Sequence, residues 1–433
     1  MIWSQAEQLD RNAMKQLQLT RLQQAVDRAY RNVPFYQKRL DEAGVRPEDI
    51  RSLADIARIP FTVKTDLRDT YPFGMFAAPL KDIVRFHSSS GTTGKPIVVG
   101  YTRNDMEMWT ECCARVASAA GVTEHDICQV AFGYGMFTGG FGMHYGIERI
   151  GATVVPAASG NSERQLMFMR DFGTTVLIAT PSYALHLSEV MAAEGLTAKD
   201  LKLRVGLFGG EGHTPEMRQL IEERFGIKDT QNYGLTEITG PGVSYECLYN
   251  DGMHINEDYF YPEIIDPKTG EVLPEGSEGE LVFTTLTKEG IPMLRYRTRD
   301  ITRLIYEPCR CGRTNVRMEL VKGRSDDMMV IRGTNVFPSQ IESVLMLIPG
   351  IGPHYQIVVT TESFMDKMEV QVELTDGSLL ERYSELERLT REIRQKIHSV
   401  LQIDVKVTLL SPNTIERSTG KAKRVIDLRG KAF

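Results

Sequence analysis

The chain reads ICQVAF at residues 127–132, ATVVPA at 152–157, TTVLIAT at 174–180 and LRVGLFGG at 203–210. Helical segments such as NDMEMWTECCARVASAA, at 104–120, alternate with these short apolar runs. Apolar runs of strand length that alternate with amphipathic helices indicate parallel strands joined through helical crossovers. The sequence therefore predicts a multi-layer α/β domain built on parallel strands.

The segments on either side of this region extend the large domain. Residues 14–40 have an amphipathic helical pattern that Pro34 interrupts, with apolar positions at Leu22, Ala25, Val26, Ala29 and Tyr30. Residues 260–320 are rich in strand-like and turn-like sequence, with the turn signals PKTG, PEGSEG and KEG. We therefore expect a large N-terminal α/β domain, residues 1–325, whose distal part is rich in β-structure.

A separate small domain is expected after this point. Helical patterns at residues 338–350 and 379–401 are interleaved with strand patterns at 355–361, 366–376 and 404–410. The strand at 366–376 alternates strictly, with its apolar positions at Met368, Val370, Val372 and Leu374. Residues 326–433 are therefore predicted to form an α+β C-terminal domain.

Composition excludes several classes of protein. With 433 residues the chain is too long for one ordinary core, and 42% hydrophobic and 25% charged residues are typical of a globular protein. A net charge of −6 gives no electrostatic basis for binding nucleic acid or an anionic membrane. No apolar run reaches the ~18 residues of a spanning helix, and the start MIWSQAEQLDRN lacks the pattern of a secretory signal. Six cysteines in so long a chain do not suggest a disulfide framework, so we expect a reducing, cytoplasmic setting.

A segment rich in serine, threonine and glycine, SSSGTTGKP at residues 88–96, follows the short run IVRFH. Its small residues allow the backbone to approach an anion, and its N–H groups and hydroxyls can hold phosphate oxygens. It is not a Walker A motif, because the G-x-x-x-x-G-K-[ST] spacing is missing. Taken alone, the segment favours phosphate binding, and an ordinary surface turn is the alternative.

Three further segments contain the residue types of a nucleotide site, although each is weak by itself. QNYGLTE, at 231–237, combines a ring that could flank adenine with a carboxylate that could bind Mg²⁺; a simple turn is the alternative. YRTRD, at 296–300, offers a carboxylate for ribose hydroxyls, or else a surface ion pair. RSTGKAKR, at 417–424, has a lysine that could neutralise charge in a transition state, unless the segment is a solvated basic tail.

The order of these segments, with GRSDD at 323–327 and GTN at 333–335 before the terminal Gly-Lys, resembles the core motifs of the adenylate-forming superfamily. The resemblance covers nearly the whole chain and is closest to the phenylacetate–CoA ligases. It is carried by FGYGMFTGGFG (132–142), MHINEDYFYPEIIDPKTGEVLP (253–274), GELVFTTLTKEGIPMLRYRTRD (279–300), RGTNVFPSQIE (332–342) and GKAKRVIDLR (420–429). One local departure lies at 414–417, where such chains often have Leu-Pro-Arg before the Gly-Lys pair.

The resemblance implies a role for each matching position. The ATP phosphates would be held by Ser88, Ser89, Gly91, Thr92, Thr93 and Gly94. The adenine site would be lined by Gly210, Glu211, Asn232 and Tyr233. The AMP phosphate would contact Thr236, Mg²⁺ would bind Glu237, and the ribose would bind Asp300 beside Arg324. The acyl pocket would be bordered by aromatic and small residues that suit a planar ring: Tyr134, Phe137, Thr138 and Gly139.

The chemistry that the resemblance implies has two steps. A carboxylate is a weak nucleophile, so its charge and that of the α-phosphate must be neutralised, here by Lys421 and Mg²⁺. The coenzyme A thiol then attacks the mixed anhydride and expels AMP. Related enzymes rotate the small domain for this step, here about a hinge at Asp326, so that Lys421 leaves. The strand around Gly333 would then line a pantetheine tunnel, which a larger side chain would block.

Two cysteine-containing stretches predict a metal site separate from this chemistry. YECLYNDGMH contains Cys247 and His254, and EPCRCGR contains Cys309 and Cys311. Three thiols and one imidazole are the ligands of a closed, structural zinc site, and both stretches are turn-like without apolar periodicity. The alternative is three unrelated thiols and a surface histidine, because the spacings are looser than in zinc fingers. The other cysteines lie in apolar sequence and are expected in the core: Cys112, Cys113 and Cys128.

We therefore expect an AMP-forming ligase that activates an aryl-acetic acid with ATP and transfers the acyl group to coenzyme A. Phenylacetate is the acid that we expect, and indoleacetate and 4-hydroxyphenylacetate also fit the sequence. One alternative is a stand-alone adenylating enzyme that passes an acyl or AMP group to a carrier protein or a cofactor such as F420. A non-catalytic nucleotide sensor is the other, and the presence of Lys421 and Glu237 argues against it. The resemblance also implies a homodimer, and the apolar stripe of residues 14–30 could be buried between subunits or on its own domain.

Overall fold

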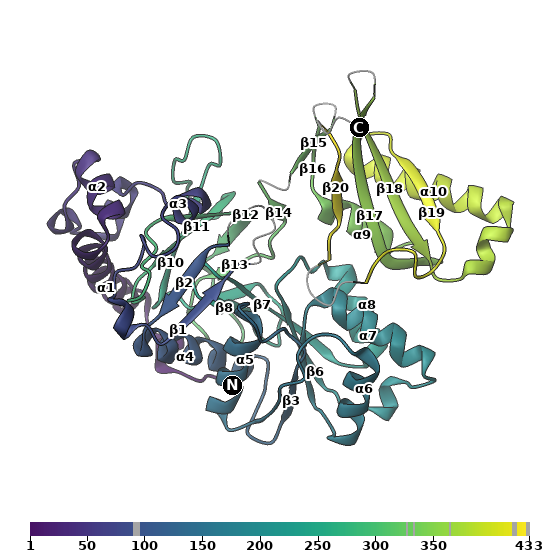
Figure 1. The fold of residues 1–433 in the computed structure, drawn as a ribbon, viewed down its shortest axis with the longest axis horizontal. Coiled ribbons are helices and arrows are strands. Elements are labelled where there is room, and N and C mark those ends of the chain that lie inside the picture. Colours follow the sequence, from purple (N-terminus) through teal and green to yellow (C-terminus); the bar gives the residue numbers. More distant parts are fainter. Residues whose placement is uncertain (90–95, 326–327, 332–333, 363–364, 418–421, 430–433) are drawn as a thin grey trace. The chain divides into compact units, whose positions relative to one another are not determined.

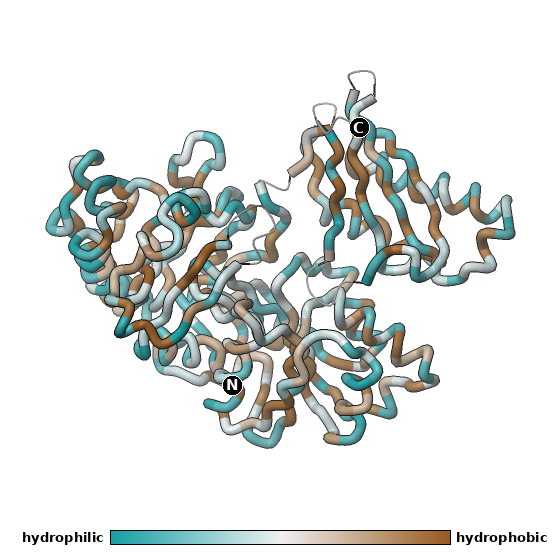
Figure 2. Tube along the Cα trace, viewed as in Figure 1, coloured by the Kyte–Doolittle hydropathy of each residue, from teal (hydrophilic) through white to brown (hydrophobic). Residues whose placement is uncertain are grey.

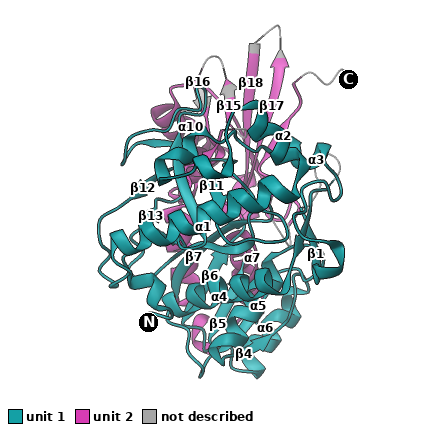
Figure 3. Cartoon of the chain, turned by 90° about the vertical axis from the view of Figure 1, so that its left-hand side faces the viewer, with its two compact units in different colours: residues 1–179, 201–210, 228–320 teal, residues 180–200, 211–227, 321–433 magenta. Residues whose placement is uncertain are grey.

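The structure, a computed structural model of the chain, describes all residues except 90–95, 326–327, 332–333, 363–364, 418–421 and 430–433. Two compact units make up the chain (Figure 3). Unit 1 comprises residues 1–179, 201–210 and 228–320, and unit 2 comprises residues 180–200, 211–227 and 321–433. Because unit 2 combines the C-terminal segment with two earlier segments, the expected domain boundary between residues 325 and 326 stays a prediction.

The four apolar runs form strands in the parallel half of the main sheet of unit 1 (Figure 1). Five strands run parallel in the order β4 (Thr153–Val155), β3 (Ile127–Val130), β5 (Val176–Ala179), β6 (Val205–Gly209) and β7 (Lys228–Leu235). Every residue of β5 and β6 is buried, which explains their uninterrupted apolar sequences. The connections contain α5 (Gly139–Ile150), α6 (Ser162–Asp171), α7 (Pro181–Ala193) and α8 (Pro215–Phe225), the last two in unit 2. The predicted α/β alternation is therefore confirmed.

Beyond β7 the sheet continues with antiparallel strands, as the strand-rich sequence at 260–320 predicted. Their order is β8 (Gly240–Glu246), β9 (Met253–Ile255), β13 (Arg317–Met318), β12 (Tyr296–Ile305), β11 (Glu278–Thr285) and β10 (Phe260–Ile265). A turn at residues 236–239 joins β7 to β8. The backbone is crowded there, because a Cβ atom added to Gly234 would lie 1.6 Å from the Gly240 carbonyl oxygen. This turn lies where the parallel half of the sheet meets the antiparallel half.

The N-terminal part of unit 1 contains α1 (Arg11–Asn32), α2 (Pro34–Glu42), α3 (Lys64–Asp69), the hairpin β1 (Arg85–Ser88) and β2 (Val98–Tyr101), and α4 (Arg103–Ala119). As predicted, Pro34 ends the first helix, and it occupies the first position of α2. The apolar stripe of α1 is buried within the chain at Met14, Leu22, Ala25, Val26 and Ala29. This stripe therefore gives no support to a subunit interface. Every helix among the described residues is too short or too polar to span a bilayer.

The C-terminal segment of unit 2 has the predicted α+β pattern. Its elements are β14 (Gly323–Arg324), β15 (Met329–Ile331), β16 (Thr334–Val336), α9 (Pro338–Met346), β17 (Ile351–Glu362), β18 (Met365–Leu374), α10 (Tyr383–Leu401), β19 (Lys406–Leu410) and β20 (Val425–Asp427). Four of these strands form a sheet in the order β19, β18, β17 and β20. The alternating residues predicted in β18 are buried in its core with the apolar side of α10, and hydrophobic stretches follow β17 and β18 in Figure 2. Short 3-10 helices occur at Gln5–Gln8, Pro47–Asp49, Leu53–Arg58, Leu80–Asp82, Ala198–Asp200 and Gly377–Glu381.

Candidate functional site

Tyr233 and Asp300, which belong to two different predicted motifs, meet inside unit 1. The Tyr233 hydroxyl donates a hydrogen bond of 2.5 Å to the Asp300 carboxylate. Asp300 is only 7% exposed, and its backbone N–H donates to the Thr298 hydroxyl at 3.0 Å. The interpretation of Asp300 as a surface ion pair therefore does not hold. The structure brings the predicted adenine-flanking ring and the predicted ribose-binding carboxylate into direct contact.

Thr236 and Glu237 begin the turn between β7 and β8, and both are buried. The Glu237 carboxylate lies 3.4 Å from the partly exposed ammonium of Lys64, the first residue of α3. In the same turn, the Thr239 carbonyl accepts a hydrogen bond of 3.0 Å from the Tyr101 hydroxyl. Tyr101 is the last residue of β2, so the turn is tied to the hairpin that carries the predicted phosphate loop.

The predicted phosphate loop connects β1 to β2, and its two ends lie within the described residues. The Ser88 N–H donates to the Met136 carbonyl at 2.9 Å. The Ser89 N–H donates to the Ile97 carbonyl at 3.0 Å, and the Ser89 hydroxyl accepts from the Ile97 N–H at 3.1 Å. Both ends of the loop are thereby held together. The predicted phosphate residues between them lie outside the described residues: Gly91, Thr92, Thr93 and Gly94.

The predicted adenine-site residues Gly210 and Asn232 lie at neighbouring strands, β6 and β7. The two strands approach closely, because a Cβ atom added to Gly209 would lie 2.4 Å from the Asn232 carbonyl oxygen. The Asn232 side-chain amide donates to the Phe208 carbonyl at 3.2 Å, and Gly210 has a φ of +88°, which favours glycine. Ligands of α/β sheets bind beyond the carboxyl ends of parallel strands, which is where these residues lie.

Glu211 belongs to unit 2, where its carboxylate accepts two backbone hydrogen bonds. The donors are the N–H of Ser182, at 2.7 Å, and the N–H of Ala422, at 2.9 Å. Arg324 is partly buried in the short strand β14 of the same unit. The assignments of Glu211 and Arg324 to the nucleotide site stay predictions. So do those of three residues outside the described part of the chain: Asp326, Gly333 and Lys421.

The predicted acyl-pocket residues lead into α5: Tyr134, Phe137, Thr138 and Gly139. The Tyr134 ring packs edge-on against Phe141 at 5.2 Å between centroids, and the Tyr134 hydroxyl lies 3.2 Å from Nδ1 of His144. Thr138 is buried, and a Cβ atom added to Gly240 would lie 2.7 Å from the Thr138 Cβ. Gly240 directly follows the turn at 236–239. The predicted acyl segment therefore lies beside the predicted phosphate-binding turn.

The predicted metal ligands come together in unit 1: Cys247, His254, Cys309 and Cys311. One ligand atom from each residue lies within 4.8 Å of all the others. Sγ of Cys247 is 3.8 Å from Sγ of Cys309, and Sγ of Cys311 is 3.4 Å from Nε2 of His254. A tetrahedral zinc ion with ordinary bond lengths places its ligand atoms about 3.8 Å apart for two sulfurs and about 3.5 Å apart for sulfur and nitrogen. The cluster therefore fits zinc, and His254 is buried rather than on the surface. The other three cysteines are buried, as expected.

Comparison with known proteins identifies the family of the chain. The AMP-binding enzyme family matches residues 16–286, and the AMP-binding enzyme C-terminal domain matches residues 333–429. The phenylacetate-coenzyme A ligase of Thermus thermophilus is 48% identical, over 99% of this chain and 100% of the relative. The chain belongs to the phenylacetate–CoA ligase family of AMP-binding enzymes.

Solved structures share the fold of this phenylacetate–CoA ligase family member. A 2-hydroxyisobutyryl-CoA ligase in the postadenylation state with R3-HIB-AMP has a TM-score of 0.92 at 32% identity, covering 98% of this chain and 91% of that chain. The same ligase with 2-HIB-AMP and CoA in the thioesterification state has a TM-score of 0.73 at 33% identity, covering 98% and 92%. The adenylate-forming fold expected from the sequence is therefore confirmed.

Two buried charged residues near the turn were missed by the sequence reasoning. KEG at 288–290 was interpreted as a turn signal, yet Lys288 is only 1% exposed and its ammonium donates to the Ile238 carbonyl at 2.5 Å. In the sequence, a lysine between a strand and a Glu-Gly turn looks the same whether it is buried or solvated. No sequence signal could therefore have identified Lys288 as buried. Asp105, also 1% exposed, had a usable signal, because Thr102 and Asp105 form a capping box at the start of α4.

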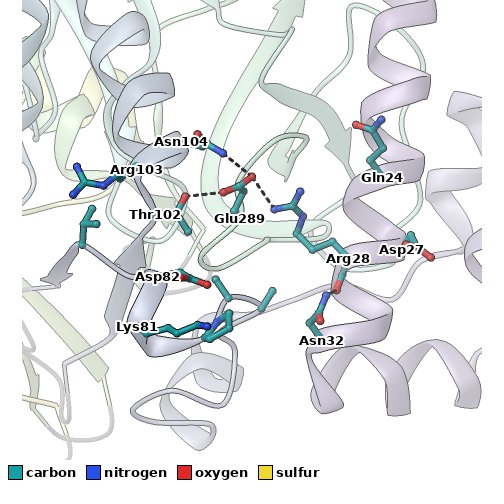
Figure 4. A pocket seen from close by; sticks show the side chains of 14 residues that line it. Gln24, Asp27, Arg28, Asn32, Lys81, Asp82, Thr102, Arg103, Asn104 and Glu289 are labelled. Atoms are coloured by element: carbon teal, nitrogen blue, oxygen red, sulfur yellow. Dashed lines mark hydrogen bonds and ion pairs between the residues drawn. The ribbon is translucent and has the colours of Figure 1, made fainter.

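A polar groove of about 810 Å³ lies in unit 1 beside α1 and the start of α4 (Figure 4). None of the residues predicted for the ligase site lines it. Its central carboxylate, Glu289, accepts hydrogen bonds from the Thr102 hydroxyl at 2.9 Å and the Asn104 amide at 3.1 Å. Arg28 lies 3.3 Å from the same carboxylate. Because these charges are paired with each other, the groove carries no ligand assignment.

The contact between Tyr233 and Asp300 leads to a graded prediction for a phenylacetate–CoA ligase. Asp300→Asn should raise the KM for ATP by about 10- to 100-fold, since a hydrogen bond to a charged group contributes ~1.5–3 kcal/mol. Tyr233→Phe should raise it only about 2- to 10-fold, because the carboxylate remains. Pyrophosphate exchange at varied ATP measures both. An unchanged KM for ATP in a folded Asp300→Asn variant would remove Asp300 from the ribose site.

Proposed function

We propose that this chain is an ATP-dependent, AMP-forming ligase that converts phenylacetate, or a close aryl-acetic acid, to its coenzyme A thioester. The observation that carries the proposal is the convergence, in unit 1, of the Tyr233–Asp300 pair, the Thr236–Glu237 turn and the phosphate-loop hairpin. The 48% identity with a phenylacetate-coenzyme A ligase over essentially the whole chain supports the choice of acid. A stand-alone adenylating enzyme that uses a carrier protein or F420 is not favoured.

In the first step the chain's own groups hold ATP and the acid in line. Asp300 accepts the ribose hydroxyls, and Tyr233, bonded to it, presents its ring to the adenine. The phosphate-loop hydroxyls and N–H groups, beginning at Ser88 and Ser89, bind the phosphates. The acid enters beside Thr138, whose neighbour Gly240 leads into the turn that carries Thr236. One carboxylate oxygen of the acid attacks the α-phosphorus, and pyrophosphate leaves.

Glu237 is proposed as the Mg²⁺ ligand. A carboxylate is the oxygen ligand that Mg²⁺ prefers, and Glu237 is buried at the same turn as the proposed phosphate contact of Thr236. Its described ionic partner is the ammonium of Lys64, a partly exposed cation that could move aside. When bound, Mg²⁺ supplies positive charge against the ATP phosphates.

The C-terminal segment is proposed to change its role between the two steps. The assignment rests on the family match at residues 333–429, which includes Lys421. We propose that residues 326–433 act as a mobile cap with its hinge at Asp326. Lys421 would serve adenylation, and Gly333 would line the path of the pantetheine arm afterwards. The coenzyme A thiol attacks the acyl carbon, the bond to AMP breaks, and AMP leaves as the second product.

The Cys₃His cluster is proposed as a structural zinc site. Four protein ligands leave no open position for a substrate, so the metal would stabilise the fold rather than take part in catalysis. The cluster joins β9 and the end of β8 to the loop before β13. Its ligands would thus fix that loop to the antiparallel half of the sheet.

A cytoplasmic homodimer is proposed from the family resemblance alone. The buried apolar stripe of α1 is used within the chain, so another surface would have to form the interface. Light scattering at micromolar concentration measures the assembly directly, and a monomeric mass would count against the dimer.

The proposed substrate is tested by measuring AMP release from ATP over a panel of acids, with and without coenzyme A. Phenylacetate should give the highest kcat/KM, with coenzyme A required for multiple turnovers. Benzoate is the matched control, because it keeps the ring and removes the methylene. A higher kcat/KM for indoleacetate or 4-hydroxyphenylacetate would move the assignment within the aryl-acetic acids. Turnover dependent on a carrier protein instead of coenzyme A would contradict the proposal.

A further inference from the structure

Lys288 is a buried cation that the adenylation mechanism above does not use. It is 1% exposed, and its ammonium donates to the Ile238 carbonyl at 2.5 Å. The same ammonium lies 5.0 Å from the centre of the Tyr101 ring. Burying a lysine ammonium carries a large desolvation penalty, so a site that only needed filling would be better served by an apolar side chain. A specific interaction therefore has to compensate for the charge.

The Ile238 carbonyl is one of three carbonyls within residues 238–241 that accept hydrogen bonds from side chains. The Thr239 carbonyl accepts from the Tyr101 hydroxyl at 3.0 Å, and the Pro241 carbonyl accepts from the Trp109 indole N–H at 2.9 Å. Lysine, tyrosine and tryptophan side chains thus hold the segment that directly follows Glu237. Gly240 within it has a φ of +99°, a backbone conformation that favours glycine.

The backbone that follows Lys288 is held by Asp105. The Asp105 carboxylate accepts hydrogen bonds from the N–H groups of Glu289, at 2.7 Å, and Gly290, at 2.8 Å. Glu289 is in turn fixed at the groove by its contacts with Thr102, Asn104 and Arg28 (Figure 4). Burial lowers the pKa of Lys288 to about 8, and the negative charges of Asp105 and Glu237 act against that lowering. The ammonium is thus stabilised by the negative charge of two carboxylates, one of which is the proposed Mg²⁺ ligand.

We propose that Lys288 is a positioning residue of the ligase, which holds the Ile238 carbonyl and thereby fixes Thr236 and Glu237 in the geometry that binds Mg²⁺ and the AMP phosphate. Lys288 touches neither substrate nor metal in this role. It acts through the backbone of the turn, by its hydrogen bond to the Ile238 carbonyl. The inference rests on the proposed function, since it takes the roles of Thr236 and Glu237 from it.

The test is Lys288→Met in the full-length protein, assayed by acid-dependent ATP–pyrophosphate exchange at varied Mg²⁺. Methionine fills a similar volume without a donor or a charge. We expect the half-saturating Mg²⁺ concentration to rise about tenfold and kcat to fall about 10- to 100-fold, equivalent to ~1.4–2.7 kcal/mol. The KM for the acid should stay within about twofold, because the acyl segment is untouched. A role in folding alone would lower the melting temperature and leave the Mg²⁺ requirement of the folded enzyme unchanged.

Two further variants keep the test decisive. Lys268→Met, an exposed lysine of the same unit, is the matched control and should behave as wild type. Tyr101→Phe removes the adjacent hydrogen bond to the Thr239 carbonyl without unpairing a charge, and should raise the Mg²⁺ requirement by a smaller factor. If Lys288→Met does not fold, Tyr101→Phe decides, and a wild-type Mg²⁺ requirement in it overturns the inference. A folded Lys288→Met enzyme with wild-type Mg²⁺ dependence and wild-type kcat also overturns the inference.

The failure of the proposed function would look different from the failure of this inference. If Glu237→Gln left the Mg²⁺ dependence unchanged, the assignment of Glu237 would be wrong. If no acid supported exchange in the wild type, the proposed function would fail and the inference with it. Wild-type exchange that responds to Glu237→Gln but not to Lys288→Met would overturn the inference alone.

Discussion

Lys421→Ala should lower the rate of acyl-adenylate formation by about 10²–10³-fold, the usual effect of removing one group that stabilises developing charge in a transition state. Thioester formation from preformed acyl-adenylate and coenzyme A should remain within about threefold of wild type, because the resemblance places Lys421 away from the site in that step. The two half-reactions are measured separately, by pyrophosphate exchange and by coenzyme A consumption with synthetic acyl-adenylate.

Lys423→Ala is the matched control for Lys421, because Lys423 is an exposed lysine of the same segment. It should leave both half-reactions unchanged. Equal losses in the two half-reactions of Lys421→Ala would contradict the proposed role, since they would place the lysine in both conformations or in the fold. A normal adenylation rate would remove Lys421 from the catalytic machinery.

Loss of one zinc ligand should have the largest effect on stability. The purified protein should contain about one zinc per chain, and Cys309→Ser should lose most of it. A closed zinc site contributes substantially to folding, so we expect the melting temperature to fall by roughly 10 °C, or ~4 kcal/mol at 2–4 °C per kcal/mol. Activity should decline only as far as the folded fraction declines. Elemental analysis and calorimetry on the same preparations measure both quantities.

Cys128→Ala controls for the loss of a buried thiol, because Cys128 lies in β3 and outside the cluster. It should keep its zinc and lose less stability than Cys309→Ser. If the purified wild-type protein contained no metal and were fully stable, the four residues would be ordinary side chains with reduced thiols. A zinc whose removal stopped the chemical step in a fully folded protein would instead have a catalytic role.

Much of the fold could be predicted because the hydrophobic pattern of the sequence closely follows the burial of the residues. The uninterrupted apolar runs at β5 and β6 correspond to strands buried along their whole length. The strict alternation in β18 corresponds to a strand with one face in the core. The division into units was harder to predict, because α7 and α8 follow strands of unit 1 in the chain but cluster with unit 2. Local hydrophobic patterns carry no information about which compact unit a connecting helix joins.

The candidate site was predictable where a motif carries its own chemistry. Tyr233 and Asp300 are far apart in the chain, and only the family resemblance put them in one site before the structure showed their contact. The Cys₃His cluster could be predicted from residue type, because both stretches are turn-like and core packing does not explain their cysteines. Lys288 could not be predicted, since the burial of a lysine depends on tertiary neighbours that neither its residue type nor its spacing reveals. The contact of the partly exposed Lys64 with Glu237 is likewise tertiary and leaves no sequence signal.

The most direct test of the account is to follow oxygen from the acid. With ATP, coenzyme A and phenylacetate labelled with ¹⁸O in its carboxylate, the account predicts that each turnover transfers one ¹⁸O atom to AMP, because the acid's oxygen attacks the α-phosphorus and leaves with AMP. With both carboxylate oxygens of the acid labelled, mass spectrometry of the products should therefore find AMP with one ¹⁸O atom, phenylacetyl-CoA with the other ¹⁸O atom in its carbonyl group, and unlabelled pyrophosphate. Label in inorganic phosphate with ADP as the second product, or unlabelled AMP, would contradict an acyl-adenylate and with it the central claim.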